Sequence, residues 1–321
     1  MGMGEFELIE RYFKRPSRQA AVGIGDDCAI WTPRPGYQLA FSADMLVEGR
    51  HFLPTVNPQL LGHKALAVNL SDLAACGATP RAFLLSLSLP RADEAWLSGF
   101  SQGLLALADA QACELIGGDT TQGPLNIAIT VMGETPLGQA ILRRTAQAGD
   151  DVYVSGHLGD ARLALEVFRG NLNVPQAVFE VARARMEKPT PRTALGASLR
   201  GIASAMADVS DGLLGDLGHI LKASGVGAQL SLQQLSGLML TRDDWDCPRE
   251  CGLRWVLSGG DDYELVFTAS PNAQHAVEAA ALSTGTRVTR IGRVTEDPHL
   301  LLVDDNGDVV PHDFRSFDHF A

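Results

Sequence analysis

The segment Pro58-Gln-Leu-Leu-Gly-His-Lys-Ala-Leu-Ala-Val-Asn-Leu-Ser-Asp-Leu-Ala-Ala-Cys76 sets the architecture of the first half of the chain. It is rich in Leu and Ala, which favours a buried helix, and Gly77 and Pro80 end it. Asn69 and Asp72 lie three residues apart inside it, so they share one helical face. A carboxylate is unexpected in such an apolar helix unless a cation compensates it. The segment therefore predicts a helix with a polar, cation-binding face.

Alternating apolar and polar residues predict strands on both sides of this helix. A second amphipathic pattern predicts another helix between the strands. The first half thus has the mixed strand and helix order of an α/β or α+β domain. The predicted strands are Tyr37–Asp44, Ala82–Leu89, Cys113–Ile116 and Asn126–Gly133, and the second helix is Trp96–Ala110.

A polar, glycine-containing connector at Arg143–Asp151 separates this series from a second one. We therefore expect an N-terminal domain over residues 1–140 and a C-terminal α/β domain over residues 150–321. The second series comprises a strand at Val152–Ser155, a loop and helix at Gly156–Gly170, a strand, turn and helix at Ile202–Ser224, a loop into a strand at Trp255–Ala269, and a strand at Arg287–Val294.

Length and composition agree with a two-domain enzyme. The chain has 321 residues, 45% of them hydrophobic and 33 of them Gly, which is enough apolar material for two ordinary cores. Its net charge of −12 gives no basic field for a phosphate backbone, so nucleic acid is not expected as a partner.

The sequence also bears on the compartment. No apolar run is long enough to cross a membrane, and the N-terminus lacks a secretory pattern, so we expect a cytoplasmic protein without a membrane partner. Five cysteines are an odd number, which does not favour a disulfide framework. Cys247 and Cys251 have no second Cys or His pair at zinc-like spacing.

Acidic residues recur beside glycines or at the ends of apolar runs. One such cluster alone is typical of a turn or a helix cap. Six of them in a chain with only four lysines, however, suggest neutralisation by a divalent cation. Oxygen ligands without a concentration of His or Cys favour Mg²⁺, which commonly bridges carboxylates to substrate phosphates. The clusters are Gly25-Asp-Asp27, Ser42-Ala-Asp44, Asn69-Leu-Ser-Asp72, Gly117-Gly-Asp119, Asp208-Val-Ser-Asp-Gly212 and Gly259-Gly-Asp-Asp262.

The glycines beside these acids support a phosphate ligand, because they let backbone N–H groups approach an anion closely. A helix that begins after Asp211 and Gly212 would also direct its positive end toward an anion. The P-loop, dinucleotide and protein-kinase motifs are absent from the sequence. The pattern therefore indicates Mg²⁺-dependent phosphoryl transfer on another scaffold.

At this level of detail the sequence resembles the thiamine-monophosphate kinase family from about residue 5 to the C-terminus. The resemblance implies a two-domain PurM-like fold, shared with aminoimidazole ribonucleotide synthetase and selenophosphate synthetase. In that fold the N-terminal domain forms a dimeric β-barrel-like core beside a C-terminal α/β domain. The matching motifs are Gly23-Ile-Gly-Asp-Asp-Cys-Ala29, Ser42-Ala-Asp-Met-Leu-Val-Glu-Gly-Arg-His-Phe52, Ala67-Val-Asn-Leu-Ser-Asp-Leu-Ala-Ala-Cys-Gly-Ala78, Gly117-Gly-Asp-Thr120, Asp208-Val-Ser-Asp-Gly-Leu213 and Ser258-Gly-Gly-Asp-Asp-Tyr-Glu-Leu265.

The resemblance implies ATP-dependent phosphorylation of thiamine monophosphate to thiamine diphosphate, the last step of thiamine diphosphate biosynthesis. It also implies a homodimer, several Mg²⁺ ions, and ATP as co-substrate. The transfer would be direct and in line at the Mg²⁺ cluster. No covalent nucleophile is expected. No obligatory base is expected either, because the second pKa of a phosphate monoester is about 6.

Carried over position by position, the resemblance implies three sets of site residues. The position after Ser42 usually carries Thr, so Ala43 would supply its backbone. Either Arg143 or Arg144 would meet ATP, and Asp261 stands where Glu is common. The Mg²⁺ ligands would be Asp27, Ser42, Ala43, Asp44, Asp72, Asp119, Asp208 and Asp211; the ATP contacts Gly118, Asp119, Arg143 and Ser210; and the thiamine monophosphate contacts His51, Asp261 and Phe317.

Two other classes of function remain open. One is a different ATP-dependent synthetase of the same fold. Selenophosphate synthetase is disfavoured, because Cys28 has no neighbouring lysine. The other is a non-catalytic cation-binding or nucleotide-sensing module, which would bind the metal without turnover.

Overall fold

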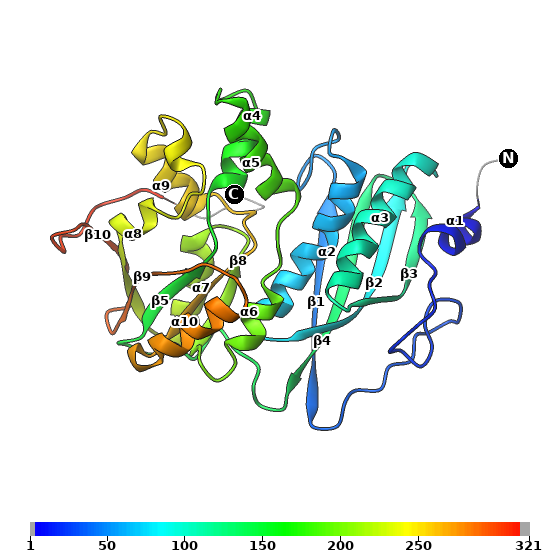
Figure 1. Ribbon diagram of the computed structural model, residues 1–321, viewed down its shortest axis with the longest axis horizontal. Helices are drawn as coiled ribbons and strands as arrows, with labels where there is room; N and C mark the ends of the chain where they lie inside the picture. The colour runs from blue at the N-terminus through cyan, green and yellow to red at the C-terminus, as the bar shows by residue number, and fades with distance from the viewer. Residues whose placement is uncertain (1–3, 315–321) are drawn as a thin grey trace. The chain divides into compact units, whose positions relative to one another are not determined.

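The computed structural model describes residues 4–314 of the chain (Figure 1). The chain divides into two compact units. Unit 1 comprises Met1–Leu73 and Ala78–Gly138, and unit 2 comprises Ala74–Gly77 and Gln139–Ala321. The second unit thus begins just before the predicted connector. The predicted site residue Phe317 lies outside the described residues.

Unit 1 is built on a four-stranded sheet with the strand order β1-β4-β2-β3. The pairs β1–β4 and β4–β2 are antiparallel, and β2–β3 is parallel. A parallel pair needs a crossover connection, which α3 supplies. The elements of this unit are α1 (Glu5–Tyr12), β1 (Tyr37–Val47), α2 (Pro58–Ala75), β2 (Thr79–Leu89), α3 (Glu94–Ala110), β3 (Glu114–Gln122) and β4 (Asn126–Pro136).

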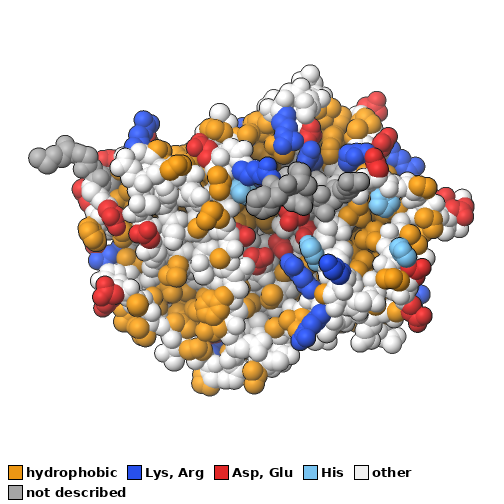
Figure 2. Space-filling view, turned by 180° about the vertical axis from the view of Figure 1, so that it is seen from behind, with side chains coloured by type: hydrophobic (Ala, Val, Ile, Leu, Met, Phe, Trp, Pro, Cys, Tyr) orange, Lys and Arg blue, Asp and Glu red, His pale blue; other side chains and the backbone are white. Residues whose placement is uncertain are grey.

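Helices α2 and α3 lie over one face of this sheet (Figure 1). The strand period of two residues places Ile127, Ile129 and Val131 of β4 in the core, at most 1% exposed. The opposite face keeps large apolar side chains in solvent, since Phe41 is 64% and Met45 55% exposed. Figure 2 shows hydrophobic side chains gathered on that side of the unit. The sheet of unit 1 therefore has one covered face and one open face.

The Gly117–Gly118–Asp119 motif lies inside strand β3, which corrects the prediction of a strand that ends at Ile116. Gly118 has a φ of +145°, and a Cβ there would stand 1.8 Å from the carbonyl oxygen of Leu85. Glycine thus lets the two backbones approach closely enough for the strand to continue. Pairing with β2 runs on to Gln122.

Unit 2 is built on a six-stranded sheet with the order β10-β7-β9-β5-β8-β6. All its neighbouring strands are antiparallel except β10 and β7. The strands are β5 (Asp151–Ser155), β6 (Ala205–Val209), β7 (Gly227–Ser231), β8 (Glu264–Ala269), β9 (Val288–Thr295) and β10 (Leu300–Val303).

Helices cover both faces of this second sheet. Val152 and Val154 of β5 pack into one core cluster, whereas Tyr153 packs into the other. Strands buried on both faces are apolar throughout, and every residue of β5 is buried. The first cluster includes residues of α4 (Asp160–Phe168), α5 (Gln176–Glu187), α7 (Leu213–Ser224), α8 (Leu232–Ser236) and α9 (Arg249–Ser258), and the second includes residues of α6 (Thr193–Ser198) and α10 (Gln274–Ser283).

The prediction of a loop from Trp255 into the next strand was wrong over its first residues. Trp255 to Ser258 form the last turn of helix α9. Leu253, Val256 and Leu257 are buried at spacings of three and four residues, so tertiary packing stabilises this short helix. The loop is confined to residues 259–263.

The predicted fold class is confirmed, because the chain forms two α/β units with a sheet in each. The dimeric barrel-like core remains a prediction. Within residues 4–314, no helix combines the length and apolar character needed to span a lipid bilayer.

Candidate metal and phosphate site

In unit 1, helix α2 turns a polar face toward strand β1. Ser42 Oγ donates to Oδ2 of Asp72 over 2.5 Å, and the backbone N–H of Asp44 donates to Oδ1 of Asn69 over 3.0 Å. Asn69 in turn donates from Nδ2 to the carbonyl oxygen of Ala65. The predicted shared face of Asn69 and Asp72 is thus confirmed, and its partner is the inner face of β1.

This α2–β1 cluster, made of Ser42, Asp44, Asn69 and Asp72, offers only oxygen ligands. Hydroxyl, carboxylate and amide oxygens are the donors that hard divalent cations prefer. Ala43 is exposed and alternates with Ser42 and Asp44 along β1, so its side chain lies on the open face. Any contribution of Ala43 to a cation on the inner face would have to come from its backbone.

Asp27 lies in an exposed turn that precedes β1. Gly25 takes a φ of +123°, and the N–H of Asp27 donates to Oδ1 of Asp26 over 2.8 Å. Upstream, the carboxylate of Glu114 on β3 accepts the N–H groups of residues 18 and 19. The turn is therefore tethered to β3 by its preceding segment.

Asp119 stands apart from the α2–β1 cluster. On β3, Asp119 is paired in register with Ser86 of β2. Ser86 is paired with Ala128 of β4, and Ala128 with Met45 of β1, so Asp119 shares the open face with Met45. Ser42 and Asp44 occupy the alternate positions of β1. Among residues 4–314, no three His, Cys, Asp or Glu side chains stand close enough together to form a metal centre. The structure therefore leaves Asp27 and Asp119 outside the cluster that it forms from Asp44 and Asp72.

His51 follows β1 in a turn that fixes its imidazole. The N–H of Val47 donates to Nδ1 of His51 over 3.0 Å, and the N–H of His51 donates to the carbonyl oxygen of Val47. Because Nδ1 accepts a hydrogen bond, the ring proton resides on Nε2. His51 can therefore present an N–H donor through Nε2.

In unit 2, the loop from β6 into α7 carries Asp208, Ser210 and Asp211. Asp208 is buried near the end of β6, and Gly212 precedes the helix with a φ of +105°. The N–H groups of Ser210 and Asp211 both donate to Oδ2 of Asp216, over 3.0 and 3.1 Å. These two N–H groups, which precede the helix, bind a carboxylate of the protein. The expectation that the start of this helix directs its positive end toward an anion stays a prediction.

Asp216 is 3% exposed, and burial raises the pKa of its carboxyl to about 7. The two N–H donors and the positive charge of Arg143 oppose that shift. Arg143 and Arg144 are both exposed. Arg143 is thus one of the charges that act on Asp216, and the choice between Arg143 and Arg144 stays a prediction.

The loop of residues 259–263 packs directly on the β6–α7 loop within unit 2. The N–H of Asp261 donates to the carbonyl oxygen of Ser210 over 2.7 Å, and that of Tyr263 to Val209 over 2.9 Å. Asp261 and Tyr263 both have positive φ angles, +64° and +53°. Such backbone is costly for residues with a Cβ and is concentrated at functional sites. The structure thus brings Ser210, Asp211 and Asp261 together.

Sequence reasoning missed several buried acids in unit 2. Glu264 accepts from Arg185 and Arg192 and from Ser155 Oγ at 2.6–2.7 Å. Burial opposes ionisation, but the hydrogen bonds and charges of the arginines hold the pKa of Glu264 below its ordinary value. Asp262 accepts the N–H of Gly159, and burial raises its pKa well above the ordinary value. The same signal that marked Asp72, an acid inside an apolar segment, could have found Asp216 and Glu264.

Comparisons with known proteins cover both units. The AIR synthase related protein, N-terminal domain, matches residues 25–135, and the AIR synthase related protein, C-terminal domain, matches residues 147–305. The thiamine-monophosphate kinase of Salmonella typhimurium is 45% identical over 328 residues, covering 100% of this chain and 99% of the relative. That of Escherichia coli strain K12 is 44% identical over 326 residues with the same coverage.

Two solved structures resemble the chain as a whole. The thiamine-monophosphate kinase of Stenotrophomonas maltophilia superposes with a TM-score of 0.83 at 44% identity, over 91% of this chain and 92% of that one. A structure described as AaThiL complexed with AMPPCP and TMP superposes with a TM-score of 0.76 at 29% identity, over 90% and 89%.

Proposed function

Because this chain belongs to the thiamine-monophosphate kinase family, we propose that it transfers the γ-phosphoryl group of ATP to thiamine monophosphate, giving thiamine diphosphate and ADP. The observation that carries the proposal is the α2–β1 cluster. It gathers Ser42 and Asp44 of strand β1 with Asn69 and Asp72 of helix α2, all of which offer oxygen ligands. Such a ligand set suits the cation that a nucleotide substrate needs.

We assign the Mg²⁺ ligands to two sets of residues, one in each unit. In both, the donors are hard oxygens, and this fits Mg²⁺ better than a softer metal. Bound Mg²⁺ would neutralise the phosphates and stabilise the charge that develops during transfer. Unit 1 supplies Asp27, Ser42, the Ala43 backbone, Asp44, Asp72 and Asp119, and unit 2 supplies Asp208 and Asp211.

We assign the nucleotide contacts to Gly118, Asp119, Arg143 and Ser210. Ser210 would use its hydroxyl, because its N–H already donates to Asp216. Arg143 rather than Arg144 is proposed, because Arg143 is one of the charges that act on Asp216. A guanidinium there would bind phosphate oxygens with directed hydrogen bonds.

We assign the acceptor contacts to His51, Asp261 and Phe317. His51 would donate from Nε2–H to a phosphate oxygen. Asp261 sits on strained backbone against the Ser210 loop and would accept from the thiamine amino group. An aromatic ring such as Phe317 can stack on a flat heteroaromatic ring.

The mechanism requires orientation more than acid–base chemistry. A phosphate monoester is already largely ionised at pH 7, since its second pKa is about 6, so its oxygen can attack without a strong base. Arg143 would bind phosphate oxygens of the nucleotide, and His51 would donate to the phosphate of the acceptor. No covalent enzyme intermediate is needed.

We also propose that the N-terminal domain, residues 1–140, mediates dimerisation, while residues 150–321 form the C-terminal domain. The open face of the unit 1 sheet exposes Phe41, Met45 and Leu84, the last at 40%. Contiguous apolar side chains on one sheet face are typical of a protein interface. A second copy of the chain is the partner that we expect there.

A coupled assay of ADP release tests the proposed activity. The purified protein with Mg-ATP should release ADP when thiamine monophosphate is added and not when free thiamine is added. Removing Mg²⁺ with EDTA should stop the reaction. Binding of ATP without turnover would instead support a sensing module. Turnover with other acceptors only would support a different synthetase of this fold.

A further inference from the structure

Asp216 lies one turn into helix α7, and its side chain folds back onto the residues before the helix. A single oxygen, Oδ2, accepts the N–H groups of both Ser210 and Asp211. The side chain is almost fully buried. Burying a carboxyl group costs free energy unless hydrogen bonds compensate it, so the two bonds of Asp216 call for an explanation.

The contacts of Asp216 fix the β6–α7 loop from its inner side. Loop residues 210 and 211 lose the freedom to rotate, because both peptide N–H groups point at one oxygen. On the other side, the carbonyl oxygen of Ser210 accepts the N–H of Asp261. The side chains of Ser210 and Asp211 are therefore presented by a backbone that is held on both sides.

Arg143 lies on a connector that is tied to helix α7, since Ser224 Oγ donates to the carbonyl oxygen of Arg143 over 3.1 Å. The positive charge of Arg143 acts to lower the pKa of Asp216, against the effect of burial.

We propose that Asp216 is a positioning residue for Mg-ATP, which orients the Ser210–Asp211 backbone by two hydrogen bonds. The inference rests on the proposed function, because that function gives Ser210 and Asp211 their ligands. Outer partners of this kind change metal affinity or activity roughly 10- to 100-fold when they are removed.

A purely structural cap provides the matched control. The buried carboxylate of Asp160 likewise accepts two backbone N–H groups, those of Leu240 and Thr241, over 2.9 and 3.0 Å. Neither Leu240 nor Thr241 is a proposed ligand of Mg-ATP. Asp160→Asn should therefore lower thermal stability without changing the affinity for the nucleotide.

Two variants separate the hydrogen bonds of Asp216 from its charge. In Asp216→Asn, the amide oxygen can still accept both N–H groups, and only the charge is lost. In Asp216→Ala, the loop contacts are lost as well. We would measure the affinity for AMPPCP with Mg²⁺ by calorimetry, the KM values for Mg-ATP and thiamine monophosphate, and the melting temperature of each protein.

We expect Asp216→Ala to weaken Mg-AMPPCP binding and raise the KM for Mg-ATP roughly 10- to 100-fold, because the loop loses both hydrogen bonds. Asp216→Asn should stay closer to the wild-type values, because its amide oxygen can still accept both N–H groups. The KM for thiamine monophosphate should change less than the KM for Mg-ATP, since Asp216 contacts the loop that carries the nucleotide and metal ligands.

If Asp216→Ala lowers the melting temperature but leaves Mg-AMPPCP binding unchanged, as predicted for Asp160→Asn, the inference is overturned. If the wild-type protein binds Mg-AMPPCP but does not phosphorylate thiamine monophosphate, the proposed function fails while the binding comparison still decides the role of Asp216.

Discussion

Ser42 on strand β1 and Asp72 on helix α2 are joined by a hydrogen bond, with 2.5 Å between Oγ and Oδ2. The bond crosses from the sheet to the helix, beside the contact that Asn69 makes with the backbone of Asp44. It places a hydroxyl and a carboxylate side by side at one point of unit 1. The proposed metal site requires this pair to be a ligand pair rather than a structural tie.

Asp72→Asn tests that distinction. An amide keeps the shape and can still hydrogen-bond Ser42, but it is a much weaker Mg²⁺ ligand, so turnover should fall roughly 100-fold or more. The melting temperature should change by only a few degrees, because no cavity is created. Steady-state kinetics and a thermal melt measure the two effects.

Asp109→Asn is the control for Asp72. Asp109 is an exposed acid at the end of α3 that pairs with Arg15 over 2.8 Å. Its replacement should leave kinetics unaltered, as surface pairs contribute little. Retention of most activity in Asp72→Asn would remove Asp72 from the metal ligands.

Gly118→Ala should destabilise the protein by roughly 2–4 kcal/mol, because a Cβ would overlap the carbonyl oxygen of Leu85 and the positive φ is strained. Gly218 in α7 has nothing within 4 Å of its would-be Cβ, so Gly218→Ala should stabilise by about 0.5–1 kcal/mol. Urea unfolding of both variants gives the free energies. Equal effects in the two would refute the close-approach argument.

Glu264→Gln should destabilise unit 2 by roughly 3–5 kcal/mol, because it leaves Arg185 and Arg192 buried without their carboxylate. The exposed acid Glu278 interacts with Gln274 and His275 on the surface of α10, and Glu278→Gln should have no measurable effect. Chemical denaturation compares the two. A neutral outcome for Glu264→Gln would mean that packing alone holds this core.

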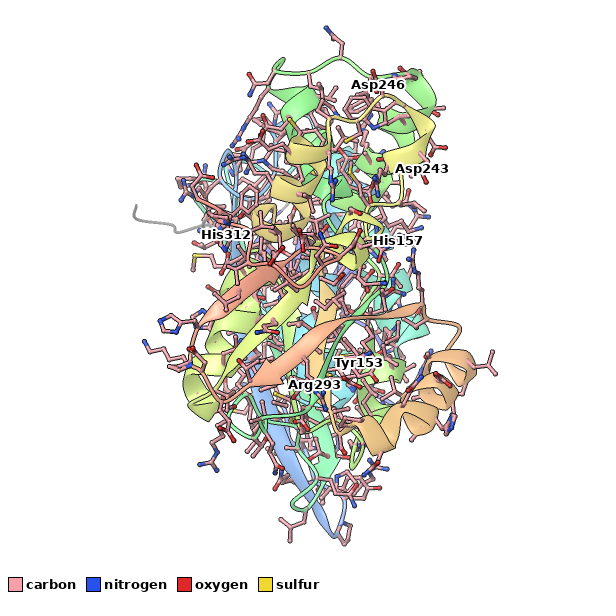
Figure 3. All side chains as sticks on the ribbon, turned by 90° about the vertical axis from the view of Figure 1, so that its left-hand side faces the viewer. Tyr153, His157, Asp243, Asp246, Arg293 and His312 are labelled. Carbon is pink, nitrogen blue, oxygen red and sulfur yellow. The ribbon has the colours of Figure 1, made fainter. Side chains whose placement is uncertain are left out.

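Stability should fall on acidification because of His157. Burial and the positive charges of Arg287 and Arg185 lower the pKa of His157 from its ordinary 6.5, although Asp160 opposes this. The unfolded chain therefore binds the proton more readily, and stability is lost as the pH falls below 6.5 toward the folded pKa. Figure 3 shows His157 well away from Tyr153 and Arg293.

His157→Asn should flatten this dependence, because the amide can replace the contact of Nδ1 with the carbonyl oxygen of Leu238, 3.2 Å away, without titrating. Melting temperatures between pH 5 and about 8 provide the test, since His is the side chain that ordinarily titrates there. Identical pH profiles for wild type and variant would exclude His157 as the source.

The helix around Asp72 was predictable, because an apolar run of that length seldom forms anything but a helix. Its polar residues Asn69 and Asp72 also fall on one helical face. The family resemblance is confirmed by full-length relatives. The course of β3 through Gly118 was not predictable, since it depends on how closely β2 approaches in three dimensions. Local pattern carries no such information.

The contact between Asp216 and the Ser210 loop shows the same limit. An Asp in the first turn of a helix is ordinarily a dipole or capping residue, and the sequence offers no sign that its side chain turns back to two earlier N–H groups.

Transfer of label from [γ-³²P]ATP tests the central claim most directly. With Mg²⁺ and thiamine monophosphate, the label should appear in thiamine diphosphate in a one-to-one ratio with ADP, and the protein itself should remain unlabelled. Label found only in inorganic phosphate, or no ADP above background, would contradict the assignment of this chain as a thiamine-monophosphate kinase.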